Sequence, residues 1–318
     1  MAEISRRKME KRIRKIEADE CKYNQIKTPT NILFNILLAI LSLFCIIPFL
    51  FVIIISITDE NSLAMNGYRF IPEKISFYAY EYIISAGESI IKSYGVTILV
   101  TVLGTVLGLL LTGTYAYALS RKNYAFRKFF TTVITIPMLF SGGMIANYLI
   151  VTKVLMLKDT IWALILPLCL NSFNIIVLRT FFKTSIPDAV VESAKIDGAS
   201  EWRLFFQIVI PMALPGLATI GLFLTLSYWN DWFNAMMYID DQNLIPLQYL
   251  LIRIESSIDW LASNKAMMGV DGVQAAANMP KETIKMAIVV ISTLPIIFAY
   301  PFFQRYFVNG LTVGAVKE

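Results

Sequence analysis

Six long apolar segments, separated by charged loops, run through this chain of 318 residues. A helix rises about 1.5 Å per residue, so about 20 apolar residues cross the roughly 30 Å of hydrocarbon in a bilayer. In hydrocarbon the backbone N–H and C=O groups must pair within the segment, and a helix satisfies this requirement. We therefore predict an all-α polytopic membrane bundle of six transmembrane helices, at Ile32–Ile57, Tyr94–Leu119, Phe129–Val151, Thr160–Leu178, Met212–Tyr228 and Ile284–Phe303.

The composition of the chain agrees with a lipid-embedded protein and excludes several kinds of chemistry. Hydrophobic residues make up 57% and charged residues 16%, whereas a soluble domain is about a quarter charged. The chain has no histidine, the residue that most often serves as a general base, proton relay or metal ligand. Cys21, Cys45 and Cys169 lack CxxC spacing and are interpreted as packing residues. We expect no metal site.

The loop charges predict the orientation of the bundle. The N-terminal tail and the loops after the second and fourth segments are basic, with Arg121, Lys122, Arg127, Lys128, Arg179, Lys183, Lys195 and Arg203 in those loops. The alternate loops are acidic, with Asp59, Glu60, Glu73, Glu81, Glu88, Asp231, Asp240, Asp241, Glu255, Asp259, Asp271 and Glu282. Basic loops stay on the cytoplasmic side, so both termini are predicted to be cytoplasmic.

This orientation predicts three parts of the chain: a basic cytoplasmic tail (1–30), the transmembrane domain (31–303) and a cytoplasmic C-terminal tail (304–318). The first apolar segment is longer than the apolar core of a signal peptide, so we expect it to remain as an anchor. Acidic residues interrupt the basic tail, which argues against nucleic-acid binding. In the second segment Gly104 and Gly108, followed by Gly113, predict a face for close helix packing.

The loop of residues 183–211 carries the signals of two short helices. Ser185 is expected to cap a helix whose first residue is Pro187, with Asp188 three residues after the cap. Gly198 is expected to end that helix in the left-handed conformation. Ser200 is expected to cap the second helix, whose aromatic residues are Trp202, Phe205 and Phe206.

The same loop contains Glu192-Ser193-Ala194, then Asp197-Gly198-Ala199, then Ile208-x-Ile210-Pro211. This pattern resembles the EAA loop of permeases from ATP-binding-cassette (ABC) importers. Ser193 stands where the family has alanine, and Ile210 where it has leucine; neither change disturbs a helix–turn–helix. The resemblance implies that this loop, here called the coupling loop, docks on an ATPase subunit through Glu192, Ser193, Ala194, Asp197, Gly198 and Ala199.

Further stretches extend the resemblance over most of the chain. The run from Ser227 to Phe233 (Ser-Tyr-Trp-Asn-Asp-Trp-Phe) resembles a signature of maltose-type sugar permeases, and the run from Tyr300 to Lys317 resembles their C-terminal tail. Pro246-Leu-Gln248 and the run from Pro280 to Ala287 are similar to the LplC/YtcP-like branch. These likenesses imply the MetI-like ABC permease fold and a sugar or oligosaccharide as the substrate.

The resemblance also implies the partners of the chain. They are a homologous second permease subunit, a dimer of ATP-binding-cassette ATPases, and an extracytoplasmic solute-binding protein. The sequence contains no Gly-x-x-x-x-Gly-Lys-Ser/Thr loop for nucleotide phosphates. We therefore expect a transport subunit without enzyme activity or cofactor of its own, with ATP and Mg²⁺ bound by the partner ATPase.

Residues that combine aromatic rings with amide or carboxylate groups are candidates for the substrate pathway. Aromatic faces suit the C–H surface of a sugar, and polar groups at membrane depth usually face a bundle interior or cavity. Trp and Tyr at a membrane boundary also form ordinary interfacial belts, so both interpretations stay open. The candidates are Tyr228, Trp229, Asn230, Asp231, Asn171, Asn174 and Asn147.

Three alternatives to a sugar permease stay open. The first is an ABC permease for a non-sugar solute. The second is an ion-coupled carrier, which usually needs an ionisable relay inside the membrane, and the predicted spans hold almost no such residue. The third is a membrane enzyme, for which we find no convincing cluster of His, Asp or Glu.

The coupling loop has an alternative interpretation as an amphipathic helix that lies on anionic lipid. Its acidic residues argue against this interpretation, because they would be repelled by the lipid; they are Asp188, Glu192, Asp197 and Glu201.

Overall fold

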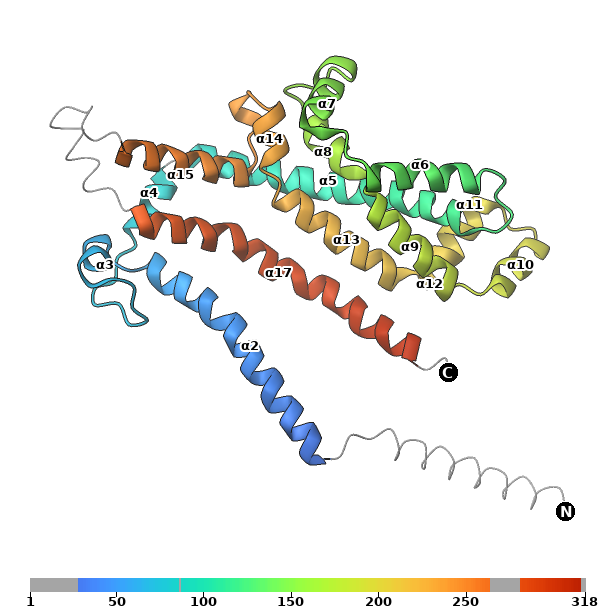
Figure 1. The fold of residues 1–318 in the computed structure, drawn as a ribbon, viewed down its shortest axis with the longest axis horizontal. Helices are drawn as coiled ribbons and strands as arrows, with labels where there is room; N and C mark the ends of the chain where they lie inside the picture. Colours follow the sequence, from blue (N-terminus) through green and yellow to red (C-terminus); the bar gives the residue numbers. More distant parts are fainter. Residues whose placement is uncertain (1–27, 86, 264–280, 316–318) are drawn as a thin grey trace. The chain divides into compact units, whose positions relative to one another are not determined.

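The computed structural model describes residues 28–85, 87–263 and 281–315. The prediction for the basic N-terminal tail therefore falls almost entirely outside the described residues, as does Asp271 of the acidic loop. The chain divides into two units, Met1–Ile54 and Ile55–Glu318. Most of helix α2 (Thr28–Ser56) belongs to the first unit, and the other described helices belong to the second (Figure 1).

The described residues form helices and loops, with one isolated β-bridge between Thr58 and Ile75. The predicted all-α class is confirmed. Besides α2, the elements are α3 (Glu60–Asn66), α4 (Tyr78–Ser85), α5 (Gly87–Ser120), α6 (Arg127–Leu139), α7 (Gly143–Leu149), the π-helix η1 (Ile150–Val154), α8 (Ile161–Cys169), α9 (Ser172–Ser185), α10 (Asp188–Ile196), α11 (Glu201–Leu204), the π-helix η2 (Phe205–Val209), α12 (Ile210–Met212), α13 (Leu214–Trp229), α14 (Phe233–Tyr238), the 3₁₀-helix η3 (Gln242–Leu244), α15 (Leu247–Ser263) and α17 (Lys281–Ala315).

Three of these helices are long and apolar enough to cross a membrane singly: α2, α5 and the Lys281–Gln304 part of α17. Two further spans are bent pairs. The axes of α8 and α9 differ by 49°, and those of the Glu201–Met212 stretch and α13 by 84°. Length and composition thus support up to five spans among the described residues, and the count of six stays a prediction.

The predicted third span, Phe129–Val151, is not one continuous helix. Helix α6 ends at Leu139, Phe140 is extended, and α7 begins at Gly143. Gly143 has a φ of 80°, a value that a right-handed helix does not contain. The predicted span is therefore divided between α6 and α7 by a backbone break that apolar length alone does not register.

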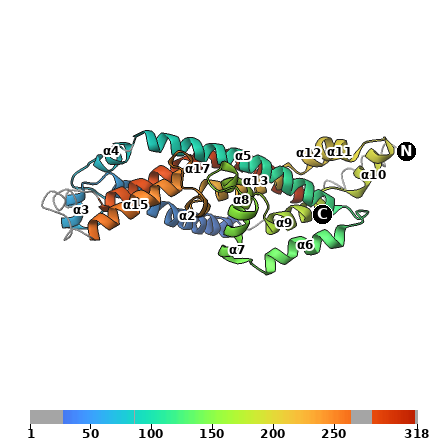
Figure 2. The same ribbon diagram turned by 90° about the horizontal axis from the view of Figure 1, so that it is seen from above.

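Helices α5 and α13 lie side by side along much of their length (Figures 1 and 2). At Gly104 the helices are so close that a Cβ atom would stand 2.4 Å from Cζ of Tyr228. At Gly108 it would stand 3.2 Å from the carbonyl oxygen of Cys169. These contacts confirm the predicted small-residue packing face, in which glycine lets two backbones approach closely.

The basic loops meet at the C-terminal end of α5, and acidic loops meet near its N-terminal end. At its C-terminal end the basic loop supplies Lys122, which pairs with Asp188 of α10 at 2.8 Å. Near its N-terminal end, Glu60 accepts hydrogen bonds from the first residues of α17, including the backbone N–H of Thr283 at 3.0 Å. There Lys285 also pairs with Asp259 at 3.0 Å. The structure thus groups the loops as the charge pattern predicts.

We predict that Gly104→Ala destabilises the folded chain by about 1–3 kcal/mol, the usual cost of overpacking a tight contact. The added methyl group would collide with the buried ring of Tyr228. The measurement is the melting temperature of the purified protein in detergent. Gly95→Ala on the same helix is the matched control, because a Cβ there meets nothing within 4 Å. Equal melting temperatures for the two variants would contradict the packing role of Gly104.

Candidate functional site

The first helix of the coupling loop, α10, begins after Pro187 rather than after a capping serine. Pro187 occupies the N-cap position, and no side chain caps this end. The predicted cap, Ser185, is instead the last residue of α9, and Ile186 is extended. Proline disfavours the helical conformation in the residue before it, so the chain leaves α9 at Ile186. The predicted capping role of Ser185 was therefore wrong.

The C-terminal end of α10 has the backbone geometry that the sequence predicts. Gly198 has a φ of 79°. The N–H of Ala199 donates to the carbonyl of Ala194 at 2.9 Å, and the N–H of Gly198 donates to the carbonyl of Lys195 at 3.0 Å. This pair of bonds is a Schellman motif, in which a left-handed residue closes the helix. Gly198 therefore sets the direction in which the chain leaves α10.

The second helix of the loop runs directly into a membrane-spanning helix. Oγ of Ser200 accepts a hydrogen bond from the N–H of Arg203 at 3.3 Å, which confirms the predicted cap. From there α11, η2 and α12 continue without a break in chain direction until Ala213, where the chain bends into α13. The coupling loop and α13 are thus joined by continuous backbone with one sharp bend of 84°.

Glu201 joins the coupling loop to the end of α5. One carboxylate oxygen lies 2.6 Å from Nζ of Lys195 on α10, and the other accepts a hydrogen bond from Oη of Tyr117 at 2.9 Å. The ring of Tyr117 also packs on Phe205, with centroids 5.2 Å apart, and lies under the guanidinium of Arg121. The sequence analysis did not single out Tyr117, since its role depends on a partner 84 positions away.

The motif residues of α10 divide between two faces. Ala194 is buried against this chain and Ala199 is half-buried, while Glu192, Ser193, Asp197 and Gly198 are exposed. The surface also carries apolar side chains: Ile196 is 85% exposed, and Trp202 is 65% exposed and stacked on Phe206. Phe205, the third aromatic residue of this stretch, is buried instead. The loop thus presents carboxylates next to bare apolar groups.

The candidate substrate residues are not brought together. Tyr228 is 2% exposed; its hydroxyl donates to the carbonyl of Ile165 at 2.8 Å, and its ring lies on Gly104. Trp229 donates from Nε1 to the carbonyl of Ser292 at 2.9 Å, joining α13 to α17. Both side chains hold helices together, so helix packing accounts for their place in the fold.

The remaining candidates lie at three other places. Asn171 caps α9 at the bend, with its Oδ1 accepting from the N–H of Phe173 at 2.9 Å, and Asn174 follows, buried. Asn230 is exposed, and the carboxylate of Asp231 accepts two hydrogen bonds from Asn234. Burial raises the pKa of that carboxyl, and the bonds from Asn234 oppose the shift.

Asn147 lines a pocket of about 450 Å³ between α7, α8 and α14, together with Asn234 and Tyr238. Two amides and an aromatic ring suit a sugar, as the sequence analysis argued for Asn147. The sequence analysis missed Asn234 as a candidate, although this residue directly follows the aromatic and polar run from Ser227 to Phe233. The roles of these residues in a substrate pathway stay predictions.

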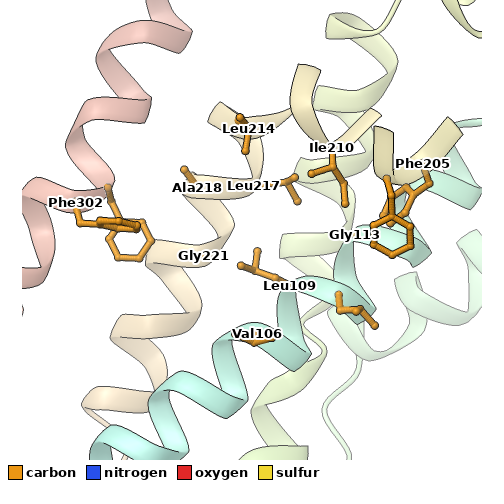
Figure 3. Close-up of a pocket in the computed structure, with 13 residues that line it drawn as sticks. Val106, Leu109, Gly113, Phe205, Ile210, Leu214, Leu217, Ala218, Gly221 and Phe302 are labelled. Atoms are coloured by element: carbon orange, nitrogen blue, oxygen red, sulfur yellow. The ribbon is translucent and has the colours of Figure 1, made fainter. Parts of the chain in front are cut away.

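A second pocket, of about 390 Å³, lies where the coupling loop meets the spanning helices (Figure 3). Phe205 and Ile210 from the loop side face Val106 of α5, Leu217 of α13 and Phe302 of α17. Every side chain drawn there is hydrocarbon. A saccharide needs hydrogen-bonding partners for its hydroxyls, so this pocket does not suit one.

Comparison with known proteins agrees with this architecture. Residues 104–313 match the family described as binding-protein-dependent transport system inner membrane component. The polygalacturonan/rhamnogalacturonan transport system permease protein YtcP of Bacillus subtilis (strain 168) is 40% identical over 280 residues, which cover 88% of this chain and 95% of that protein. Protein LplC of the same organism is 41% identical over 272 residues, covering 86% and 89%.

A solved structure is also similar. It is a chain of a bacterial ABC transporter involved in the import of the acidic polysaccharide alginate. The TM-score is 0.73 and the sequence identity is 32%, and the match covers 87% of this chain and 96% of that one.

We predict that Tyr117→Phe loosens the coupling loop without unfolding the bundle. The change removes the hydroxyl that donates to Glu201 and keeps the ring that packs on Phe205. Losing one such bond costs about 1 kcal/mol, so amides of α11 should exchange with deuterium about five times faster. Tyr115→Phe is the control, because that hydroxyl donates to Phe130 of α6. Unchanged exchange of α11 in Tyr117→Phe would contradict the anchoring role.

Proposed function

This chain belongs to the family of binding-protein-dependent transport system inner membrane components, and we propose that it is the permease subunit of an ABC importer that carries a saccharide across the cytoplasmic membrane. The observation that carries the proposal is the coupling loop, which meets the end of α5 and continues into α13. Together with a homologous second permease, the chain would form half of the translocation pathway.

The exposed face of the coupling loop is the proposed docking surface for the ATPase. Glu192 and Asp197 can pair with basic groups of a partner. Ile196 and Trp202 would be shielded from water by it; exposed apolar groups rimmed by charge are typical of protein interfaces. The ATPase dimer binds ATP and Mg²⁺. Its closure would displace α10 and, through Glu201 and the continuous backbone, tilt α5 and α13 between inward-open and outward-open states.

The substrate proposal draws on the similar proteins. The names of YtcP and of the alginate importer both state polysaccharide transport, and their likeness covers nearly the whole of this chain. The pocket lined by Asn147, Asn234 and Tyr238 suits a solute that has both polar groups and apolar faces, such as a sugar. An extracytoplasmic solute-binding protein would deliver the saccharide to the acidic end of the bundle.

We predict that Gly198→Val uncouples uptake while the chain still inserts and folds. A side chain with φ near 79° costs on the order of 1–2 kcal/mol, so the chain would leave α10 in another direction. We expect ATP-dependent saccharide uptake to fall at least about tenfold, since a misplaced docking helix cannot pass on the closure of the ATPase. Uptake by cells, with immunoblots of the membrane fraction, measures both effects.

Gly67→Val is the matched control for this substitution. Gly67 has a φ of 70°, and a Cβ atom at either glycine meets nothing within 4 Å. The backbone strain of a side chain at Gly67 is at least as large, because its ψ of −172° lies in a region that is essentially restricted to glycine, and Gly67 follows α3, at the other end of the bundle. Full uptake by Gly198→Val, or equal losses in both variants, would refute the docking role of this turn.

We predict that the chain needs a separate ATPase for transport. Liposomes that hold this chain and the co-purified second permease should show no saccharide uptake under a proton or sodium gradient, because the spans lack an ionisable relay. Adding the co-purified ATPase, the binding protein and ATP should restore uptake. Gradient-driven uptake without the ATPase would favour an ion-coupled carrier instead.

A further inference from the structure

The end of α5 carries a charged side chain whose hydrogen-bonding capacity the coupling loop leaves unused. Arg121 directly follows α5 and is half-buried. Its Nε is buried and has no hydrogen-bond acceptor among the described residues, and none of the ion pairs between them includes its guanidinium. A buried donor without an acceptor costs the folded chain free energy. A second conformation that supplies the acceptor would recover this cost.

Arg121 lies beside a carboxylate that is already occupied. Its guanidinium carbon is 4.9 Å from the ring centroid of Tyr117, and the hydroxyl of that ring donates to Oε2 of Glu201 at 2.9 Å. The other carboxylate oxygen of Glu201 is 2.6 Å from Nζ of Lys195. Arg121 attracts Glu201 as well, but more weakly than Lys195 does. Two cations, one on α10 and one at the end of α5, are thus within reach of the same carboxylate.

The two possible ion pairs differ in what they connect. Lys195 lies on α10, before the turn at Gly198, and Glu201 follows that turn, so their pair spans the joint of the coupling loop. The two side chains are 45% and 59% exposed, and water weakens such a pair. A pair with Arg121 would instead join α11 to α5, and a guanidinium can offer a carboxylate two parallel donors.

Asp188 is the other acid near Arg121, but it is badly placed to supply the missing acceptor. It begins α10 and pairs with Lys122 at 2.8 Å. Its side chain is 60% exposed, whereas the Nε of Arg121 is buried. A carboxylate that reaches this Nε must come from the packed side of the guanidinium, where Tyr117 and Glu201 lie.

We propose that Arg121 is a positioning residue that takes Glu201 over from Lys195 when the ATPase moves α10. This ion-pair switch rests on the proposed function and adds to it a residue that holds the moving loop. In this structure Glu201 shares its carboxylate between α10 and α5. After the switch both oxygens would face α5, one toward Arg121 and one toward Tyr117. Helix α10 could then turn about Gly198 while α11, and with it α13, stays attached to α5.

The test compares two states of the whole importer in lipid nanodiscs, one without nucleotide and one with ATP bound to a hydrolysis-deficient ATPase. Deuterium exchange of the amides of α11 and η2 reports how firmly this stretch is held in each state. Without nucleotide, Lys195→Gln should speed the exchange and Arg121→Gln should leave it unchanged. With ATP bound the order should reverse, and Arg121→Gln should speed the exchange about tenfold, the effect of losing one charge-assisted pair.

Two further variants make the test specific. Arg121→Lys should keep part of the protection in the ATP-bound state, because it keeps the charge and loses the paired geometry. Lys122→Gln is the matched control: it removes the neighbouring cation, whose partner is Asp188, and should leave the exchange of α11 and η2 unchanged in both states. Unchanged exchange of Arg121→Gln without nucleotide also shows that this variant is folded.

The kinetics of uptake give a second readout, which a purely structural role would not produce. Arg121 lies at the coupling loop and not beside the candidate substrate residues. Its loss should therefore act on the conformational step, so Arg121→Gln should lower the kcat of saccharide uptake about tenfold and leave the KM within about twofold. A raised KM with an unchanged kcat would contradict the ion-pair switch.

Uptake by the wild-type importer is measured in parallel, so that the two proposals can fail separately. If the wild type takes up saccharide and Arg121→Gln changes the exchange equally in both states, or in neither, the ion-pair switch is wrong and the proposed function stands. Absence of any saccharide uptake by the wild type refutes the proposed function and, with it, the switch.

Discussion

The contact between α5 and α13 at Gly104 is the one on which the rest of the described bundle depends. Apolar side chains gain little from leaving lipid for another helix, so close packing and interhelical hydrogen bonds must hold membrane helices together. Gly104 provides both: its missing side chain makes room for the ring of Tyr228, whose hydroxyl then reaches the carbonyl of Ile165 on α8. Three helices meet at this point, and Trp229 adds α17 one residue later.

The coupling loop is attached to the same helices, so that in the proposed mechanism one loop would act on both of them. Its backbone continues into α13, and Glu201 ties its two short helices to Tyr117 at the end of α5. The contact with Tyr117 is formed within this chain, whereas the proposed docking face of α10 stays exposed. In the proposed transport cycle, a force applied to α10 would therefore reach α5 and α13 at two points, and the tight contact at Gly104 would make the two helices respond together.

The sequence predicted the features that arise from neighbouring residues. Gly198 takes the left-handed conformation and Ser200 caps α11, because these outcomes depend on a few adjacent backbone groups. Gly104 and Gly108 form a packing face, since small residues four positions apart lie on one side of a helix. The same reasoning failed at Ser185, where Pro187 decided the end of α9, and apolar length did not locate the backbone break at Phe140.

By itself, the sequence determined that the chain is helical, that lipid is its solvent, and which loops share a side, because these properties follow from apolar length and charge. Only the tertiary structure decided what individual polar and aromatic side chains do. Tyr228 and Trp229 were candidates for a substrate and pack between helices in the fold, while Tyr117 bonds to a partner 84 positions away and Asn234 lines a pocket together with Asn147. An aromatic residue near a membrane boundary can face a sugar, lipid or another helix equally well by composition, and only the position of its neighbours selects among them.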